Sequence, residues 1–231
     1  MVRPGYRLND NILLPIFPTE GQPVGLTGFK AMVPQWGIDW GRFIDIDARA
    51  FDGDQAAKQK RLQFAYRIDT SLVNPLATLP SSIAEHPSSL AQRNLLRGWR
   101  LGLPNGQRVA QAMNVPVIAD EDILIGKDSD EGNDVKPIAD VSKVFAGNCP
   151  LWTYILAEAR HHRENVELPV VPKGKSVATP RLGPVGGRLA AEVFLGLLFG
   201  DGHSYLNLRP EFVPEGNPSY ALRDFIKFAL G

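Results

Sequence analysis

Three side chains near the middle of the chain are of the types that hold a small molecule. If their segment is helical, Leu90, Asn94 and Arg97 follow one another at i, i+4 and i+7 and share one face. Arg93 and Arg100 flank that face. Guanidinium groups pair with carboxylates, and a side-chain amide accepts a donor such as an imidazole N–H. The face therefore suits an amphiphilic anionic ligand, although most charged helix faces are only solvated surface.

The same segment carries the clearest signals of secondary structure. Ser88 or Ser89 can cap a helix, and the sequence Leu-Gly-Leu-Pro at 101–104 ends it. Pro104 can start a second helix, which we expect to end near Met113. The sequence thus predicts a helix, a tight corner and a second helix.

Elsewhere the pattern favours short helices joined by irregular connections. The chain contains 22 glycines and 19 prolines in 231 residues, so turns are expected to interrupt many elements. Helices are predicted at 39–45, 58–69, 150–159, 189–199 and 220–230, and one short strand at 12–16. The helix at 189–199 is apolar nearly all round and is expected to be buried. The predicted fold class is mainly α, with Pro/Gly-rich irregular connections.

Composition describes a globular protein and argues against other classes. With 44% hydrophobic and 22% charged residues the chain is neither disordered nor collagen-like. Lys plus Arg and Asp plus Glu are 25 each, which argues against a nucleic-acid surface as the main function. Charges at Arg188 and Glu192 interrupt the apolar helix, so no membrane span is expected. We expect residues 1–231 to form a single domain. The sequence indicates no compartment and shows no signal peptide.

Other candidates for chemistry are weaker. Glu158 and His161 form one Glu-x-x-His pair, but a di-iron site needs a second such pair. The acidic segment 128–134 departs from the calcium-hand pattern and is expected to be a solvated loop. Cys149 precedes a core helix, so we expect a buried structural thiol. No catalytic residue and no metal ligand is predicted.

The run from Asn94 to Pro104, Asn-Leu-Leu-Arg-Gly-Trp-Arg-Leu-Gly-Leu-Pro, resembles a motif of the animal-type haem peroxidases, the peroxidase and cyclooxygenase superfamily. In that family Asn-x-x-Arg-x-Arg-Asp-x-Gly-x-Pro is typical. Residues 1–10 resemble the segment just after the family's proximal histidine, and residues 150–152 and 182–194 resemble bacterial members. The similarity covers nearly the whole chain, and the combination is more specific than any single motif.

The resemblance implies a haem protein with a partial peroxidase fold. Asn94 matches the asparagine that accepts a hydrogen bond from the proximal histidine, and Arg97 matches the arginine that faces a haem propionate. Leu90 would pack near the proximal face of the haem. The complete enzyme is expected to oxidise small reducing donors with hydrogen peroxide, in the response to oxidative stress. This chain would correspond to its C-terminal, haem-proximal part.

The resemblance also has gaps. The chain has four histidines, His86, His161, His162 and His203. None stands in the context of the family's proximal or distal histidine, which are expected upstream of the opening segment together with the catalytic arginine. Peroxide cleavage needs an axial ligand, a distal base and a positive group. We therefore expect weak haem uptake and negligible turnover.

Two further expectations concern self-association and an alternative function. Apolar surface at the Leu90 face and on the helix 189–199 would favour self-association. The alternative hypothesis is a helical binding or structural module that performs no redox chemistry.

Overall fold

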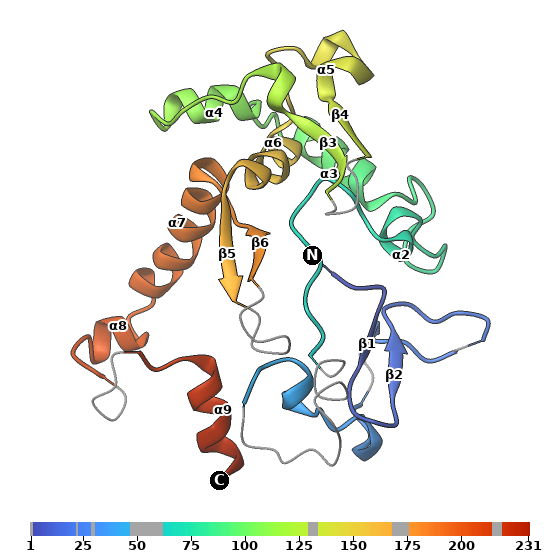
Figure 1. The fold of residues 1–231 in the computed structure, drawn as a ribbon, viewed down its shortest axis with the longest axis vertical. Coiled ribbons are helices and arrows are strands. Elements are labelled where there is room, and N and C mark those ends of the chain that lie inside the picture. Colours follow the sequence, from blue (N-terminus) through green and yellow to red (C-terminus); the bar gives the residue numbers. More distant parts are fainter. Residues whose placement is uncertain are drawn as a thin grey trace. The chain divides into compact units, whose positions relative to one another are not determined.

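The computed structural model describes residues 2–21, 23–28, 31–46, 62–128, 134–167, 176–213 and 219–231 (Figure 1). Of these residues 41% are helical and 14% lie in strands, which form three small antiparallel sheets of two strands each. The fold is therefore mixed α/β, and the predicted mainly α class is wrong. The strands are only three to five residues long and pair as local ribbons, so they carry no alternating pattern that the sequence could have shown.

Contacts divide the chain into two compact units. The first contains Met1–Pro4, Tyr66–Val166 and Val177–Val193, and the second contains Gly5–Ala65, Glu167–Ser176 and Phe194–Gly231.

The second unit contains a small hairpin and short helices. Strands β1 (Gly5–Arg7) and β2 (Leu13–Pro15) pair antiparallel, which confirms the strand expected at 12–16. The helix expected at 39–45 is a single 3₁₀ turn, η2 (Trp40–Arg42), which follows another, η1 (Pro34–Trp36). Two further helices of this unit are α8 (Tyr205–Leu208) and α9 (Leu222–Leu230). Residues 62–69 are not helical, and residues 58–61 of that prediction lie outside the described residues.

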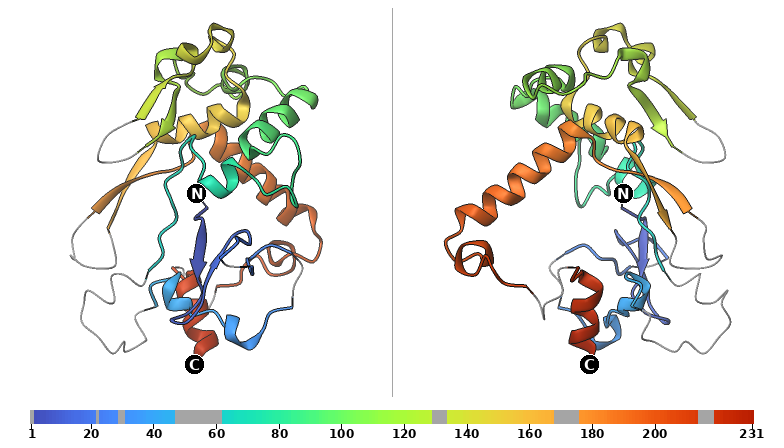
Figure 2. Two further views of the ribbon diagram at one scale, coloured as in Figure 1. Left: turned by 90° about the vertical axis from the view of Figure 1, so that its right-hand side faces the viewer. Right: turned by 60° about the vertical axis from the view of Figure 1, so that its left-hand side comes forward.

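The first unit contains most of the helices. In chain order its elements are α2 (Asn74–Ala77), α3 (Leu90–Arg100), α4 (Gly106–Ala112), η3 (Asp120–Asp122), β3 (Leu124–Lys127), β4 (Asp134–Pro137), α5 (Ile138–Val141), η4 (Lys143–Phe145), α6 (Leu151–Glu158) and η5 (Ala159–His161). Strands β5 (Arg163–Glu167) and β6 (Ser176–Pro180) and helix α7 (Pro184–Gly200) begin or end in this unit and cross its boundary. Helix α6 contacts both α3 and α4 (Figure 2).

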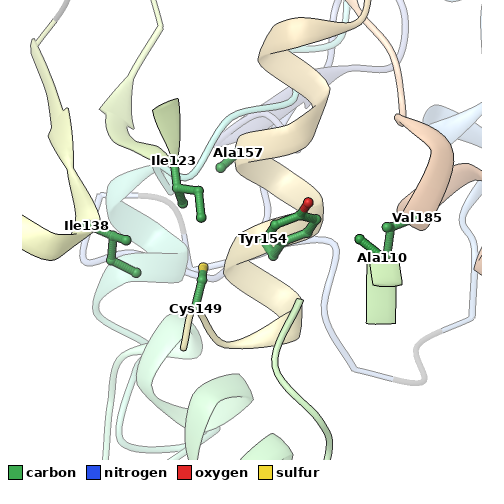
Figure 3. Packing of buried hydrophobic residues seen from close by; sticks show 7 residues of the cluster. All are labelled: Ala110, Ile123, Ile138, Cys149, Tyr154, Ala157 and Val185. Carbon is green, nitrogen blue, oxygen red and sulfur yellow. The ribbon is translucent and has the colours of Figure 1, made fainter. Parts of the chain in front are cut away.

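The core of the first unit is built around α6. Its buried residues are Ala110, Ile123, Ile138, Cys149, Tyr154, Ala157 and Val185 (Figure 3). Tyr154 is fully buried, and its hydroxyl oxygen accepts a hydrogen bond from the backbone N–H of Ile118 at 3.0 Å. The first residue of α4, Gly106, lies directly against the Tyr154 ring, where a Cβ would overlap the ring atoms. Glycine at this position is therefore a packing requirement.

A buried carboxylate joins α6 to α7. Glu158, the last residue of α6, is 1% exposed. Its two carboxylate oxygens accept hydrogen bonds from the backbone N–H groups of Val185 and Gly186, each at 3.1 Å. These N–H groups lie in the first turn of α7, where no helical partner exists for them. Glu158 thus fixes the start of α7, and the two hydrogen bonds offset the free-energy cost of burying its carboxylate.

Beyond its first turn α7 is not buried, contrary to prediction. Val185 and Gly186 are its only buried residues. Val193, Phe194 and Leu197 are 61%, 68% and 66% exposed. A helix that is apolar on all sides is buried only where other elements of the fold pack against it, and the sequence of the helix alone does not show whether such elements exist. No helix among the described residues is long and apolar enough to cross a membrane.

The role of Glu158 can be tested by substitution. We expect Glu158→Ala to lower the free energy of unfolding by about 3 kcal/mol, because two buried N–H groups lose their acceptor. Glu158→Gln keeps one acceptor oxygen and should cost less. The matched control is Glu192→Ala, which removes an exposed ion pair with Arg188 and should cost about 0.5 kcal/mol or less. Urea unfolding of the variants gives the comparison, and equal losses for Glu158→Ala and Glu192→Ala would contradict the capping role.

Candidate functional site

The predicted helix, corner and helix are present at 88–113. The side chain of Ser89 caps α3 by accepting a hydrogen bond from a first-turn N–H at 3.4 Å. The corner turns at Gly102, whose φ of 64° is in the left-handed region that favours glycine. The second helix begins at Gly106 and not at Pro104, because the Asn105 side chain caps it at 2.8 Å. Capping and turn residues in the local sequence thus position α3, the corner and α4.

A groove of about 710 Å³ lies between α3, the corner and the start of α6. This volume is within the range of small-molecule sites, roughly 300–1,000 Å³. The groove's polar lining residues are Gln92, Asn94, Arg97, Asn105 and Asn148. Its apolar side chains include Leu95, Leu96, Trp99, Leu101, Leu103, Phe145, Leu151 and Trp152. The arrangement combines flat apolar walls with a few polar groups, as ligand sites do.

Two of the three predicted site residues line this groove. Asn94 and Arg97 are both part of its wall, whereas Leu90, which is partly buried one turn earlier on α3, is not. Helical spacing from Arg97 does not predict Trp99 as a site residue, because on α3 it lies about half a turn away. The sequence does not predict Trp152 as a site residue either, because only the packing of α6 against α3 brings it to the groove.

Among the described residues, the one charged side chain that lines the groove is Arg97. No carboxylate is found among the described residues that line it. Arg97 and Arg100 lie in the last turn of α3, and neither guanidinium group has an ion-pair or hydrogen-bond partner within the described part of the chain. The amide of Asn94 likewise has no partner there. An anionic ligand would meet an available guanidinium and an available amide on one wall.

A hydrogen-bond network holds the opposite wall. The backbone N–H of Gly147 donates to both carboxylate oxygens of Asp120, at 2.9 and 2.8 Å. The buried amide of Gln107 donates to Asp120 at 3.1 Å and accepts from the N–H of Cys149 at 3.0 Å. Asn148 stands between these two anchored residues and lines the groove. The loop wall is therefore fixed by α4 before any ligand binds.

The side chains of Glu158 and His161 do not form a metal site in the structure. Glu158 is occupied by the first turn of α7, and Nε2 of His161 lies 2.9 Å from the backbone oxygen of Asp122. No cluster of three or more metal-ligating side chains is present among the residues that the structure describes.

Asp128 corrects the prediction of a solvated acidic loop. It is 7% exposed and accepts hydrogen bonds from the guanidinium groups of Arg160, at 3.0 Å, and Arg163. Both arginines lie more than thirty residues later in the chain, so no local pattern indicated the pairing. Residues 129–133 of the same prediction lie outside the described residues.

Cys149 is a buried thiol, as predicted. It is 0% exposed, and burial, with a smaller effect of the Asp120 charge, raises its pKa from 9.0 to about 12. Burial also raises the pKa of the Tyr154 hydroxyl, although its hydrogen bond with Ile118 acts in the opposite direction. A thiol that keeps its proton is a poor nucleophile.

Comparison with known proteins gives no assignment. No family model, no curated protein and no solved structure matches this chain.

The raised pKa values predict a loss of stability in alkali. The folded protein keeps the proton on Cys149 at pH values where the unfolded thiol has lost it. This contribution is complete below pH 9 and is lost as the pH rises toward 12, by about 1.4 kcal/mol for each pH unit. Urea unfolding at a series of pH values should show the decline, and a less steep decline for Cys149→Ala. Rapid reaction of the native thiol with a disulfide reagent at pH 8 would contradict its burial.

Proposed function

We propose that this chain binds haem in the groove between α3 and α6, as a relative of the animal-type haem peroxidases. One observation carries the proposal. The sequence resemblance assigns to Asn94 and Arg97 contacts near haem. Both residues line one groove, and the resemblance was identified from sequence motifs without reference to any groove.

The groove's residues suit the organic part of haem. The guanidinium of Arg97 is available for a propionate carboxylate, and a charge-assisted pair of this kind is strong when partly shielded from water. Leu95, Leu151 and Trp152 offer apolar surface for the porphyrin face. Asn105 and Asn148 add amide groups at the loop wall. A flat, amphiphilic dianion matches this distribution of polar and apolar groups.

The groove's residues do not suit the iron. Haem iron is usually held by histidine, cysteine, methionine or tyrosine. None of these is among the described residues that line the groove. Without an imidazole there, the Asn94 amide has no ring N–H to accept. We therefore propose no step of peroxide cleavage by these residues, and we expect bound haem to turn over hydrogen peroxide and a reducing donor negligibly.

The missing iron ligand favours the second candidate function, a binding module without redox chemistry. Its ligand would be an amphiphilic carboxylate in general, with haem as one member of the class. The two candidates differ in whether a porphyrin is preferred over an unrelated carboxylate of similar size, such as a long-chain fatty acid.

Titration with haemin, metal-free protoporphyrin IX and a long-chain fatty acid tests both candidates. We expect haemin and protoporphyrin to bind with similar Kd, because the proposed contacts involve the ring and its carboxylates. Arg97→Gln should weaken both about tenfold, as loss of a charge-assisted hydrogen bond of roughly 1.5 kcal/mol implies. The matched control is Arg209→Gln, which removes an exposed arginine of the second unit.

The outcomes separate the hypotheses. Equal affinity of Arg97→Gln and the unchanged protein for porphyrins would refute binding at this groove. Much tighter binding of haemin than of protoporphyrin, with a sharp Soret band, would show that an iron ligand exists and that the proposed inactivity is wrong. Equal binding of the fatty acid and the porphyrins would favour the general module.

A further inference from the structure

The segment around α3 carries basic side chains and no acidic ones. Residues 86–119 contain four arginines and no aspartate or glutamate, in a protein whose formal net charge is zero. Three of them, Arg93, Arg97 and Arg100, follow one another at i, i+4 and i+7 and are exposed. The fourth, Arg108, is exposed on α4.

The most exposed apolar side chains of the same region lie next to these arginines. Trp99, Leu101 and Leu103 are 78%, 65% and 51% exposed. They lie at the end of α3 and on the turn that follows it. We call these three residues, together with Arg93 and Arg100, the basic corner. No residue of α3 is buried, although the helix is amphipathic. Leu90, Leu95 and Leu96 are partly buried, and Trp99 is the exposed member of the apolar stripe.

We propose that the basic corner docks on an anionic lipid surface. A helix with arginines on its polar face and tryptophan and leucine on the other is typical of segments that lie in a membrane interface. Each cationic side chain near such a surface is attracted to anionic headgroups. Indole rings such as that of Trp99 prefer the headgroup level, and arginine side chains can extend from there to phosphate groups.

The exposed side chains of the corner favour a lipid surface over a folded acidic partner. Trp99, Leu101 and Leu103 are more than half exposed. Exposed apolar side chains beside cations can enter a fluid headgroup layer, whereas a folded partner would need a matching site for each of them.

The docking requires no ligand in the groove. It shares Trp99, Leu101 and Leu103 with the groove's lining, however, so a ligand bound there would contact the same apolar side chains.

The test is co-sedimentation of the full chain with vesicles of phosphatidylcholine, with and without phosphatidylglycerol. We expect binding only to the anionic vesicles, and we expect high salt to weaken it because exposed charges are screened. Absence of binding to the anionic vesicles, or equal binding to both kinds, would overturn the proposal. So would binding to soluble polyglutamate without binding to vesicles, which would identify an acidic polypeptide as the partner class.

Substitutions locate the binding surface. Arg93→Gln combined with Arg100→Gln should weaken binding to anionic vesicles about 25-fold, roughly fivefold for each arginine. Lys136→Gln combined with Lys143→Gln is the matched control, since it removes two exposed charges elsewhere in the same unit and should have little effect. Trp99→Ser should weaken binding without changing the unfolding temperature, because the side chain is exposed. Equal effects of the two double variants would show only a response to net charge and would refute the basic corner.

Discussion

The packing of Tyr154 on Gly106 is the contact on which the first unit depends. This packing sets how closely α4 approaches α6. The N–H of Gly106 also donates a hydrogen bond to the backbone oxygen of Cys149 at 2.8 Å, which holds the two segments together. Because α6 is held in this way along its middle, its first residues, Leu151 and Trp152, have a fixed place beside α3. The groove is therefore a consequence of core packing and not of a loop that closes on it.

Buried polar groups complete what apolar packing begins. Glu158, Asp120 and Gln107 have partly or fully buried side chains, and each makes hydrogen bonds to backbone N–H groups or to another buried side chain. An unpaired buried group costs about 1–3 kcal/mol, so these contacts discriminate strongly between the observed arrangement of loops and any shifted one. The order that they impose explains how a unit with few long elements keeps a defined groove.

The sequence predicted those features that depend on neighbours in the chain. A serine cap, a left-handed glycine and a proline lie within one short segment, and they suffice to define α3 and its corner. Apart from the strand at 12–16, the hairpin strands escaped prediction because three-residue strands such as β1 carry no periodicity. The burial of Asp128 depends on Arg160 and Arg163, which are distant in sequence. The sequence could place Asn94 and Arg97 on one helix face, but not the groove beside them, because tertiary packing supplies the opposite wall.

The arginine stripe of α3 is compatible with the helix but is not needed by it. Like charges at i, i+4 such as Arg93 and Arg97 destabilise a helix by about 0.2–0.5 kcal/mol for each pair. Arg97 and Arg100 lie in the last turn, where the helix dipole favours cations by roughly 0.3–1 kcal/mol each at exposed sites. Over the two adjacent pairs the repulsion amounts to about 0.4–1 kcal/mol, and the dipole offsets it by about 0.6–2 kcal/mol for Arg97 and Arg100 together, whereas Arg93, outside the last turn, gains no such contribution. An anionic group placed on this face would remove the repulsion while the favourable dipole interaction remained. Under the proposals above, a ligand carboxylate in the groove or a phosphate-bearing surface at the corner would supply this anionic group.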